Sequence, residues 1–552
     1  MLHLTADAAQ LARHYGLDAH RSLLFSAIRL DSFPLVAPLI AQSGEDRFLL
    51  VRQQEQGNAL SAGVPKERIR FYAPWVTIDP RVVADTPAAA SLASLVAELA
   101  SDDDRVHLAA DVVLSHHRAL TGTGALEVTA DDRAPAPVVA HEIDTDAVLA
   151  RFGGWRAEGV RVARRLIEGI EHLDGLAAEL SATEDTRFAG LTALARERAL
   201  DAVLLAATPN VTEAIGHAQP AGSVAMWLPE AERLVLLAPQ GTPGIPGAAA
   251  GTYPSAGAAV RALSPGARTG VEEEFIGIGL ARELEREGAE LVGVSSDLGH
   301  WRDVRDHEDL GFQVVAARAS VFAIEEALAW AEDGLAAGRE FTELDIHAVY
   351  LDKIVEFRTA HDIPFGIEPY FTNLHSSNRM LFPGPPVHFP INAETTCIQL
   401  DAGVRIVVEG VTVATSDMAR SLPRTAAAKQ AYGFFFDVVR DGIIGQLRPG
   451  VVCEDVHEGT LRYLAPHLDR MREIGMLGTE VDFDTEYRKR NVGHLMGKQE
   501  SFANELRPGY KHVLQVGSYG AAEIPWRYDD AAIGTEDLWY VGRDRTYIVS
   551  KR

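Results

Sequence analysis

The sequence is poor in cysteine and has no long apolar segment, and each absence excludes a class of protein. Its two cysteines, Cys397 and Cys453, are too few for a disulfide framework and are not spaced as a metal-binding pair. We expect both to be small buried apolar residues. No run of roughly 18 or more apolar residues occurs, and the first residues lack the cationic and apolar parts of a secretory signal. The sequence therefore predicts a soluble cytoplasmic protein with no membrane partner.

Positive charge is scarce as well. The chain has 52 basic and 78 acidic residues, which gives a formal net charge of −26. Such a surface repels a phosphate backbone, and no basic cluster is interleaved with aromatic residues. We therefore exclude nucleic acid as a partner.

What the sequence does contain is typical of a folded chain. Hydrophobic residues make up 47% and charged residues 24% of its 552 residues, which is ordinary for a globular protein and too apolar for a disordered one. At roughly 100 to 200 residues per domain, this length predicts three domains.

A short internal echo indicates a repeated unit at the start of the chain. Leu11-Ala12-Arg13 is followed by GLDA at 16–19, and Leu194-Ala195-Arg196 is followed by ALDA at 199–202. In each copy a helix pattern leads into an apolar strand pattern, at 22–28 and 202–209.

Each copy also closes with a long amphipathic helix pattern, at 159–173 and at 320–335. An acidic stretch at 181–185 separates the two copies. We therefore predict two tandem α/β domains at 1–182 and 183–315, followed by a C-terminal domain at 316–552.

The C-terminal domain alternates between helix and strand patterns. Thr342 can cap a helix whose first turn carries Glu343 and Asp345. Residues 397–422 predict two strands joined by a tight turn at Glu409-Gly410, and 427–447 has a helical pattern. The last hundred residues read again as strands. This predicts a mixed α+β domain.

The predicted hairpin brings two carboxylates together. A turn at Glu409-Gly410 places Asp401 opposite Asp417 within one position. Like charges on one sheet face repel, so the pair invites a cation that both can bind. A bulge or a shifted turn would instead put one aspartate in solvent, and the spacing alone favours that alternative.

Four motifs that carry acidic residues or histidine follow one another in the C-terminal domain: LDAG at 400–403, SDMARSLP at 416–423, VGHLMG at 492–497 and GTEDLWYV at 534–541. In this order they resemble the ligand motifs of the aminopeptidase P, prolidase and creatinase family. The resemblance implies a C-terminal pita-bread domain after two creatinase-type N-terminal domains, and a homodimer. It also implies a site for one or two divalent ions, of Mn, Fe, Co or Zn, with Asp401, Asp417, His494 and Glu536 as ligands.

Two departures from the family pattern make the expected site atypical. Gln515, in LRPGYKHVLQVG, aligns with a family glutamate ligand and offers a neutral amide oxygen instead, which predicts a mononuclear site or a changed metal preference. Glu523, in AAEIPW, is the alternative ligand. Glu500 and Ser501 stand where family peptidases have a His-Glu pair, and Gly534 replaces an arginine.

The family also has a histidine upstream of its first aspartate. His375 in YFTNLHSSNRM is the nearest equivalent, and His388 in PPVHFP is its rival. Either could polarise a substrate carbonyl or donate a proton. With Glu500, His375 is our candidate for catalysis.

The leading hypothesis is a metallohydrolase that cleaves a C–N bond in a short peptide or a small amino-acid derivative. The departures make ordinary Xaa-Pro aminopeptidase activity doubtful. Two alternatives stay open. One is a metal-dependent lyase or other small-molecule enzyme on the same fold, and the other is a metal-free binding module with a degenerate site.

Overall fold

The computed structural model describes residues 1–16, 39–52, 59, 63–72, 91–100, 105–180, 184–219, 222–245, 247–377, 379, 384–479, 482–484, 491–498, 500–524, 527–528 and 531–552. The chain forms two compact units. The first contains Met1–Pro74, Val83–Phe152 and Asp185–Arg302, and the second includes Gly153–Glu184 and Asp303–Arg552. The predicted three-domain boundaries at 182 and 315 stay a prediction.

The first unit contains a six-stranded mixed sheet in the order β4-β3-β2-β1-β5-β6. Its strands are β1 Leu2–Thr5, β2 Leu39–Ser43, β3 Asp46–Arg52, β4 Ile69–Tyr72, β5 Arg105–Leu108 and β6 Glu127–Ala130. The helices of this part are α1 Ala8–Tyr15, η2 Lys66–Arg68, α5 Leu92–Ala100 and α6 Leu114–Thr121. The strand predicted at 22–28 lies outside the described residues.

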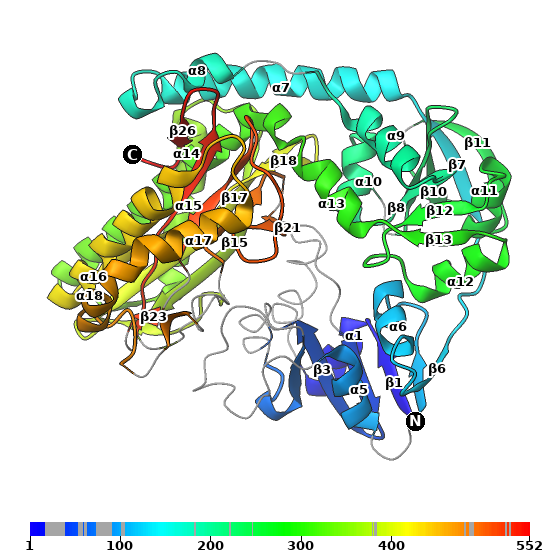
Figure 1. Cartoon of the computed structure of the whole chain (residues 1–552), viewed down its shortest axis with the longest axis horizontal. Helices are drawn as coiled ribbons and strands as arrows, with labels where there is room; N and C mark the ends of the chain where they lie inside the picture. Colours follow the sequence, from blue (N-terminus) through cyan, green and yellow to red (C-terminus); the bar gives the residue numbers. More distant parts are fainter. Residues whose placement is uncertain are drawn as a thin grey trace. The chain divides into compact units, whose positions relative to one another are not determined.

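A seven-stranded sheet in the order β11-β7-β10-β9-β8-β12-β13 forms the rest of the first unit (Figure 1). Its strands are β7 Val138–Ile143, β8 Ala202–Leu205, β9 Val224–Leu228, β10 Arg233–Pro239, β11 Ala248–Tyr253, β12 Arg268–Val271 and β13 Glu290–Gly293. Its helices are α9 Arg187–Glu197, α10 Thr208–Ile215, α11 Ala256–Leu263, α12 Ile278–Arg286 and α13 Ser295–Asp303. The predicted helix-then-strand order of the second copy is thus confirmed by α9 and β8.

Both long closing helices are present. Helix α7, Thr145–Ile167, includes the first part of the pattern at 159–173 and ends before Gly169, whose φ of 76° is outside the helical region. Short turns η3 Glu171–Leu173 and α8 Leu176–Glu179 follow. Helix α14, Leu310–Ala336, after η4 Asp306–Asp309, contains the whole of the pattern at 320–335.

Helix α15, Glu343–Ala360, begins where the sequence predicts. The Thr342 side chain accepts the Asp345 N–H, and the Asp345 carboxylate accepts the Thr342 N–H at 2.8 Å. This reciprocal capping box satisfies two backbone donors that a helix start would otherwise leave unpaired.

The C-terminal part is the predicted mixture of helices and strands, with α14 and α15 packed against its first sheet (Figure 1). That sheet has the order β15-β17-β18, and β19 also pairs with β17. Its strands are β15 Gly366–Ser376, β17 Cys397–Val408, β18 Val411–Thr415 and β19 Met418–Pro423. A five-stranded sheet has the order β21-β20-β22-β25-β26, with β20 Gly493–Met496, β21 Glu500–Glu505, β22 Tyr519–Glu523, β25 Glu536–Val541 and β26 Thr546–Ile548.

The predicted helix at 427–447 divides into three consecutive helical segments of different kinds. These are α16 Ala426–Asp437, a π-turn η5 Val438–Ile443 and a 3₁₀ turn η6 Ile444–Gln446. The remaining elements are α17 Cys453–Leu464, η7 Ala465–His467, α18 Leu468–Glu473, and the short strands β14 Phe341–Thr342, β16 Pro390–Ile391, β23 Arg527–Tyr528 and β24 Ala531–Ala532.

Cys397 and Cys453 are both buried in the apolar core under these helices, as the sequence predicts. Their partners there include Phe434, Phe435 and Trp539. Burial raises the pKa of both thiols, which makes them unreactive packing residues. Within the described part of the chain, no helix is long and apolar enough to cross a membrane.

Candidate metal centre

The hairpin that carries the first two acidic residues turns where predicted but in a different register. Glu409 and Gly410 have φ of 51° and 82°, the left-handed pair that a tight hairpin turn needs. A bulge then shifts the register, because Val407 pairs with Thr412 but Ile406 pairs with Ala414.

The shifted register corrects the predicted opposition of the two aspartates. Asp401 lies opposite Ala419, two positions from Asp417, and not within one position of it. A shift of two positions keeps both side chains on the same face of the sheet. Asp417 is 7% exposed, so the alternative that leaves one aspartate in solvent is wrong for Asp417.

Three buried side chains from separate segments meet beside this hairpin. Asp417, His494 and Glu536 each offer a ligand atom, and these atoms lie within 4.8 Å of one another. His494 Nε2 is 3.6 Å from Asp417 Oδ2 and 3.9 Å from Glu536 Oε1. Two carboxylates and an imidazole are a usual donor set for a divalent transition metal.

The ring of His494 is oriented by its own strand. Its Nδ1 lies 3.1 Å from the Leu495 carbonyl oxygen, so Nδ1 carries the proton. Nε2 is therefore the ring nitrogen that faces Asp417 and Glu536, and it is the atom that would bind a metal.

Gly493 allows this strand to lie close to its neighbour. Its φ is 134°, and a Cβ there would overlap the Ala521 carbonyl oxygen. Glycine therefore lets β20 pair with β22 where His494 faces Ala521.

Glu523 is a further, half-buried carboxyl next to the cluster. It ends β22 directly opposite Glu536 on β25. Burial raises the pKa of Glu523 to about 7; His494 lowers it, while Asp417 and Glu505 raise it further. Its pairing with Glu536 places Glu523 next to one member of the cluster.

Gln515, by contrast, lies away from the cluster. It is exposed in the loop before β22, and its N–H donates to Ser518 Oγ at 2.9 Å. The structure therefore places Glu523, the alternative ligand, and not Gln515 opposite Glu536. The residue that pairs with Glu536 lies eight positions after Gln515 in the sequence.

Asp401 lies at the edge of this group. Its Oδ2 accepts a hydrogen bond from Asn373 Nδ2 at 3.1 Å. Tyr350, which donates to the Gly403 carbonyl at 2.9 Å, is fully buried beneath the hairpin. Burial raises the pKa of Tyr350, and Asp401 and Asp417 both raise it further. Three of the four predicted ligands are thus clustered. Asp401 is close enough to raise the pKa of one of them, Glu536.

The charges of the cluster fit a bound cation. Burial, followed by Asp417, Glu523 and Asp401, raises the pKa of Glu536 well above its usual value. Glu536 Oε1 accepts no hydrogen bond from any residue that the structure describes. Buried carboxylates in such proximity either bind protons or share a positive ion, so the residues present suit a divalent metal.

The two candidate histidines differ in their surroundings. His375 is 2% exposed on β15, where it pairs with Gln399 two positions from the Asn373–Asp401 pair, so it shares that face. His388 is exposed in a loop. The structure therefore places His375, and not His388, on the face that carries Asp401.

A buried carboxylate fixes the segment next to His375. Glu343 accepts hydrogen bonds from Ser376 Oγ at 2.6 Å and Arg379 Nε at 2.8 Å. It also accepts the Val387 N–H at 3.2 Å. The sequence placed Glu343 only in the first turn of a helix and missed this role.

The region of the missing His-Glu pair holds another carboxylate. Glu500 begins β21, and its side chain lies outside the described part of the structure. Glu505, at the end of β21, pairs with His494 and is 2% exposed. Its Oε2 lies 3.2 Å from Arg507 Nη1. Nothing in the sequence near Glu505 marked it as a site residue, since only the pairing of β20 with β21 brings it there.

An arginine supports the strand of Glu536 although Gly534 lacks a side chain. Arg420 donates from Nη1 to the Glu536 carbonyl at 2.6 Å and from Nη2 to Asp537 Oδ1 at 2.6 Å. The space beside Gly534 is filled by the side chain of Gln399, because a Cβ at Gly534 would lie 2.7 Å from its Nε2.

Comparison with known proteins gives a domain match and several similar structures. Residues 314–543 match the sequence model of Metallopeptidase family M24. No curated protein matches the chain. The X-prolyl aminopeptidase of Caenorhabditis elegans, described as a cytosolic enzyme with a di-nuclear active site, aligns over 98% of this chain and 83% of its own, with a TM-score of 0.57 and 14% identity.

Two further structures align over 66% of this chain. The prolidase of Pyrococcus horikoshii OT3 is covered over 98% of its length, with a TM-score of 0.50 and 16% identity. The N-terminal domain of the FACT complex subunit SPT16 from Cicer arietinum (chickpea) is covered over 96%, with a TM-score of 0.50 and 13% identity. At such identities the likeness is one of fold.

Proposed function

We propose, from the aminopeptidase P/prolidase-like pita-bread fold that the chain has, that it is a metal-dependent hydrolase of a C–N bond. Its substrate would be a short peptide or a small amino-acid derivative. The observation that carries the proposal is the buried cluster of Asp417, His494 and Glu536, whose ligand atoms lie within 4.8 Å of one another. The match of residues 314–543 to a metallopeptidase family supports it.

Asp417, His494 and Glu536 would hold one ion, and Glu523 and Asp401 would add carboxylates for that ion or for a second one. When bound, a divalent ion of Mn, Fe, Co or Zn supplies a Lewis acid and lowers the pKa of water. The protein keeps the site dry, since Asp417, His494 and Glu536 are at most 7% exposed. Low exposure strengthens each charge interaction in the site.

His375 would contact the substrate. It shares a sheet face with Asn373 and Asp401, and Glu343 fixes the neighbouring Ser376. From there its imidazole would donate a hydrogen bond to the carbonyl under attack, or a proton to the departing nitrogen. Its geometry is thus set by β15 and by the Glu343 carboxylate.

The absence of the His-Glu pair favours a small substrate. Peptidases with that pair position a peptide and stabilise its transition state, and Glu500 and Ser501 stand here instead. We therefore propose that the substrate is a small amino-acid derivative in preference to an Xaa-Pro peptide. We also propose that the active form is a homodimer. A lyase that uses the same ligands is distinguished by whether water enters the product.

A metal-free binding module is the alternative from another class. The SPT16 domain has a similar fold. Against this alternative, burial raises the pKa of both the Glu523 and the Glu536 carboxyl when no cation is present. Ionised carboxyls held so closely without a cation destabilise the folded state.

Elemental analysis of the purified protein tests the proposal. We expect the wild type, dialysed against metal-free buffer, to retain one or two equivalents of Mn, Fe, Co or Zn, and His494→Ala to lose them. His388→Ala, an exposed histidine in a loop, is the matched control and should retain the wild-type content. If the wild type binds none of the four metals even after supplementation, the hydrolase proposal is wrong.

A second experiment identifies the reaction. The metal-loaded protein is incubated in ¹⁸O-labelled water with Xaa-Pro dipeptides, N-acyl amino acids and amidino or cyclic amino acids. A hydrolase puts ¹⁸O on the carbon of the cleaved C–N bond, in a carboxyl group from an amide or in a urea or amide carbonyl from an amidino group, whereas a lyase yields product without it. A metal-loaded protein that is inert toward every substrate class would count against enzymatic function.

A further inference from the structure

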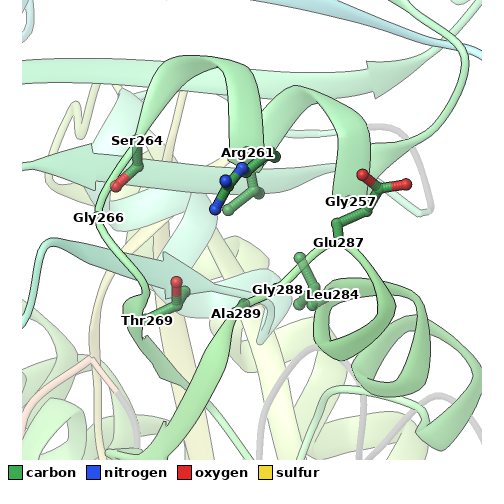
Figure 2. Close-up of a pocket in the computed structure, with 10 residues that line it drawn as sticks. Gly257, Arg261, Ser264, Gly266, Thr269, Leu284, Glu287, Gly288 and Ala289 are labelled. Atoms are coloured by element: carbon green, nitrogen blue, oxygen red, sulfur yellow. The ribbon is translucent and has the colours of Figure 1, made fainter.

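A hollow in the first unit is too small to be a ligand site. It lies between α11, α12 and β12 and has a volume of about 10 Å³ (Figure 2). That is room for a single water molecule. This hollow therefore suggests no further function, whereas a buried group of ion pairs in the second unit bears on the candidate metal centre.

Three ion pairs link four buried side chains of the second unit. Arg156, on α7, donates from Nε to Asp309 Oδ1 at 2.9 Å and from Nη2 to Glu308 Oε2 at 2.7 Å. Lys498 pairs with the other oxygen of the Asp309 carboxylate. None of the four residues is more than 8% exposed. Buried charges are stable only when they are paired, so each partner fixes the place of the others.

Asp309 stands at the start of helix α14. It is the N-cap residue, and an aspartate at that position usually accepts the first N–H groups of its own helix. Its two oxygens bind Arg156 and Lys498 instead. The start of α14 is thus fixed to the segment that carries Lys498.

The residue before Lys498 joins the segments of two candidate metal ligands. The Gly497 carbonyl accepts hydrogen bonds from the Thr415 N–H at 2.6 Å and from the Thr415 hydroxyl at 3.0 Å. Gly497 follows His494 by three positions, and Thr415 precedes Asp417 by two. This one carbonyl therefore sets how the end of β20 lies against the end of β18.

Helix α14 also holds the segment of Asp417. Ser320 Oγ, on α14, lies 2.6 Å from Ser416 Oγ, which in turn accepts the Val404 N–H at 2.9 Å. A helix is a stiff spacer with a fixed rise per residue. The same element thus anchors Lys498 through its first turn and Ser416 through a later one.

We propose that Lys498 is a positioning residue of the metal centre. Its ion pair with Asp309 holds the segment after His494 against the segment before Asp417. This role rests on the proposed function, since it requires that the His494 and Asp417 side chains bind a metal ion. Metal ligands have to be held within about 0.5 Å of their working positions. Loss of the ion pair therefore lowers metal affinity, although Lys498 itself does not bind the ion.

Cobalt binding to the full-length protein tests this role. Lys498→Met removes the charge, keeps an unbranched side chain and leaves Asp309 paired with Arg156, so the variant is expected to fold. We expect its Co²⁺ affinity, measured by competition with a chelator, to fall by about 10- to 100-fold, the usual effect of losing an outer partner of a metal ligand. The d–d absorption bands of the bound Co²⁺ should also move, because they report the ligand geometry.

Lys353→Met is the matched control. Lys353 is half-buried on α15, and its Nζ lies 2.7 Å from Glu356 Oε2. The control therefore makes the same substitution in another ion pair of the second unit. Its Co²⁺ affinity and absorption should be those of the wild type.

Hydrogen exchange in the metal-free protein separates positioning from a general loss of stability. The Thr415 N–H is bonded to the Gly497 carbonyl, and Leu461 lies within helix α17 of the same unit. In Lys498→Met, the Thr415 amide should exchange roughly tenfold faster or more, while the Leu461 amide keeps its wild-type rate. A general loss of stability would speed both amides by the same factor.

The outcomes separate this role from the proposed function. A wild type that binds no Co²⁺ overturns the proposed function, and the role of Lys498 with it. If the wild type binds Co²⁺, the role alone is overturned when Lys498→Met keeps the wild-type affinity and absorption, or when Lys353→Met loses as much affinity. It is also overturned when the Thr415 and Leu461 amides exchange faster by the same factor.

Discussion

Replacing Glu523 by glutamine is expected to weaken metal binding and, at the same time, to stabilise the metal-free protein at neutral and alkaline pH. Glu523 is half-buried opposite Glu536, and its pKa is raised from 4.5 to about 7. A carboxyl so placed is costly when it is ionised without a cation and useful when a cation is present. The two effects therefore have opposite signs.

The size of the stability effect follows from the pKa. A rise from 4.5 to about 7 corresponds to about 3 kcal/mol at 1.36 kcal/mol per unit. Because the pKa is raised in the folded state, the folded metal-free protein binds more protons than the unfolded chain between these two values. The free energy of unfolding of the wild type therefore falls as the pH rises from about 4.5 to about 7.

Glutamine has no charge to bury, so Glu523→Gln should lose this pH dependence. At pH 8 we expect the metal-free variant to be more stable than the metal-free wild type by up to about 3 kcal/mol, and below about pH 4 nearly equal to it. Added metal should stabilise the wild type strongly and the variant weakly, since ligand binding stabilises in proportion to affinity. Urea unfolding followed by tryptophan fluorescence, with and without metal, measures both effects.

The matched control is Gln515→Glu, which puts a carboxylate at the position that sequence alignment favours. Because Gln515 is exposed and outside the cluster, this variant should change neither metal content nor stability. The reasoning is refuted if Glu523→Gln keeps the full metal content and gains no stability at pH 8. It is equally refuted if Gln515→Glu raises the number of bound ions.

Three further predictions test the support of the site. Metal affinity should rise with pH toward and above about 7, because burial raises the pKa of Glu523 to about 7 and the bound proton must leave before metal binds. Titration calorimetry in buffers of different ionisation enthalpy should show this proton release. A metal affinity that stays constant from pH 6 to 8 would contradict the prediction. Gly493→Ala should destabilise the second unit by about 3 kcal/mol or more and lower its metal content, because the φ of Gly493 is 134° and a Cβ there would overlap the Ala521 carbonyl oxygen. Thermal unfolding measures the loss of stability, and an unchanged melting temperature would refute the prediction. Thr342→Ala should cost about 1 kcal/mol through the lost capping box with Asp345, without changing metal content; a loss of metal would show that the cap does more than start a helix.

Much of the local structure could be predicted from the sequence. The start of α15 at Thr342 and the turn at Glu409-Gly410 depend on neighbouring residues alone, and both are present as predicted. The order of four short motifs was sufficient to predict the pita-bread fold, because motif order follows the chain and does not depend on how strands pair. The burial of the two cysteines followed from composition.

The arrangement of the site residues could not be predicted from neighbouring residues alone. A bulge of one residue in the hairpin moved the partner of Asp401 to Ala419. A single extra residue in a strand changes every pairing beyond it, and no turn or propensity signal at this position announces it.

The same limitation explains why the sequence favoured Gln515 over Glu523 and gave no sign that Glu505 pairs with His494. Each position depends on which residue of one strand faces which residue of another, and loop length can shift that match without changing any motif. The sequence by itself determined the residue types of the centre and their order along the chain. Only the tertiary structure decided which carboxyls meet His494, because strand register is a property of paired segments that are distant in sequence.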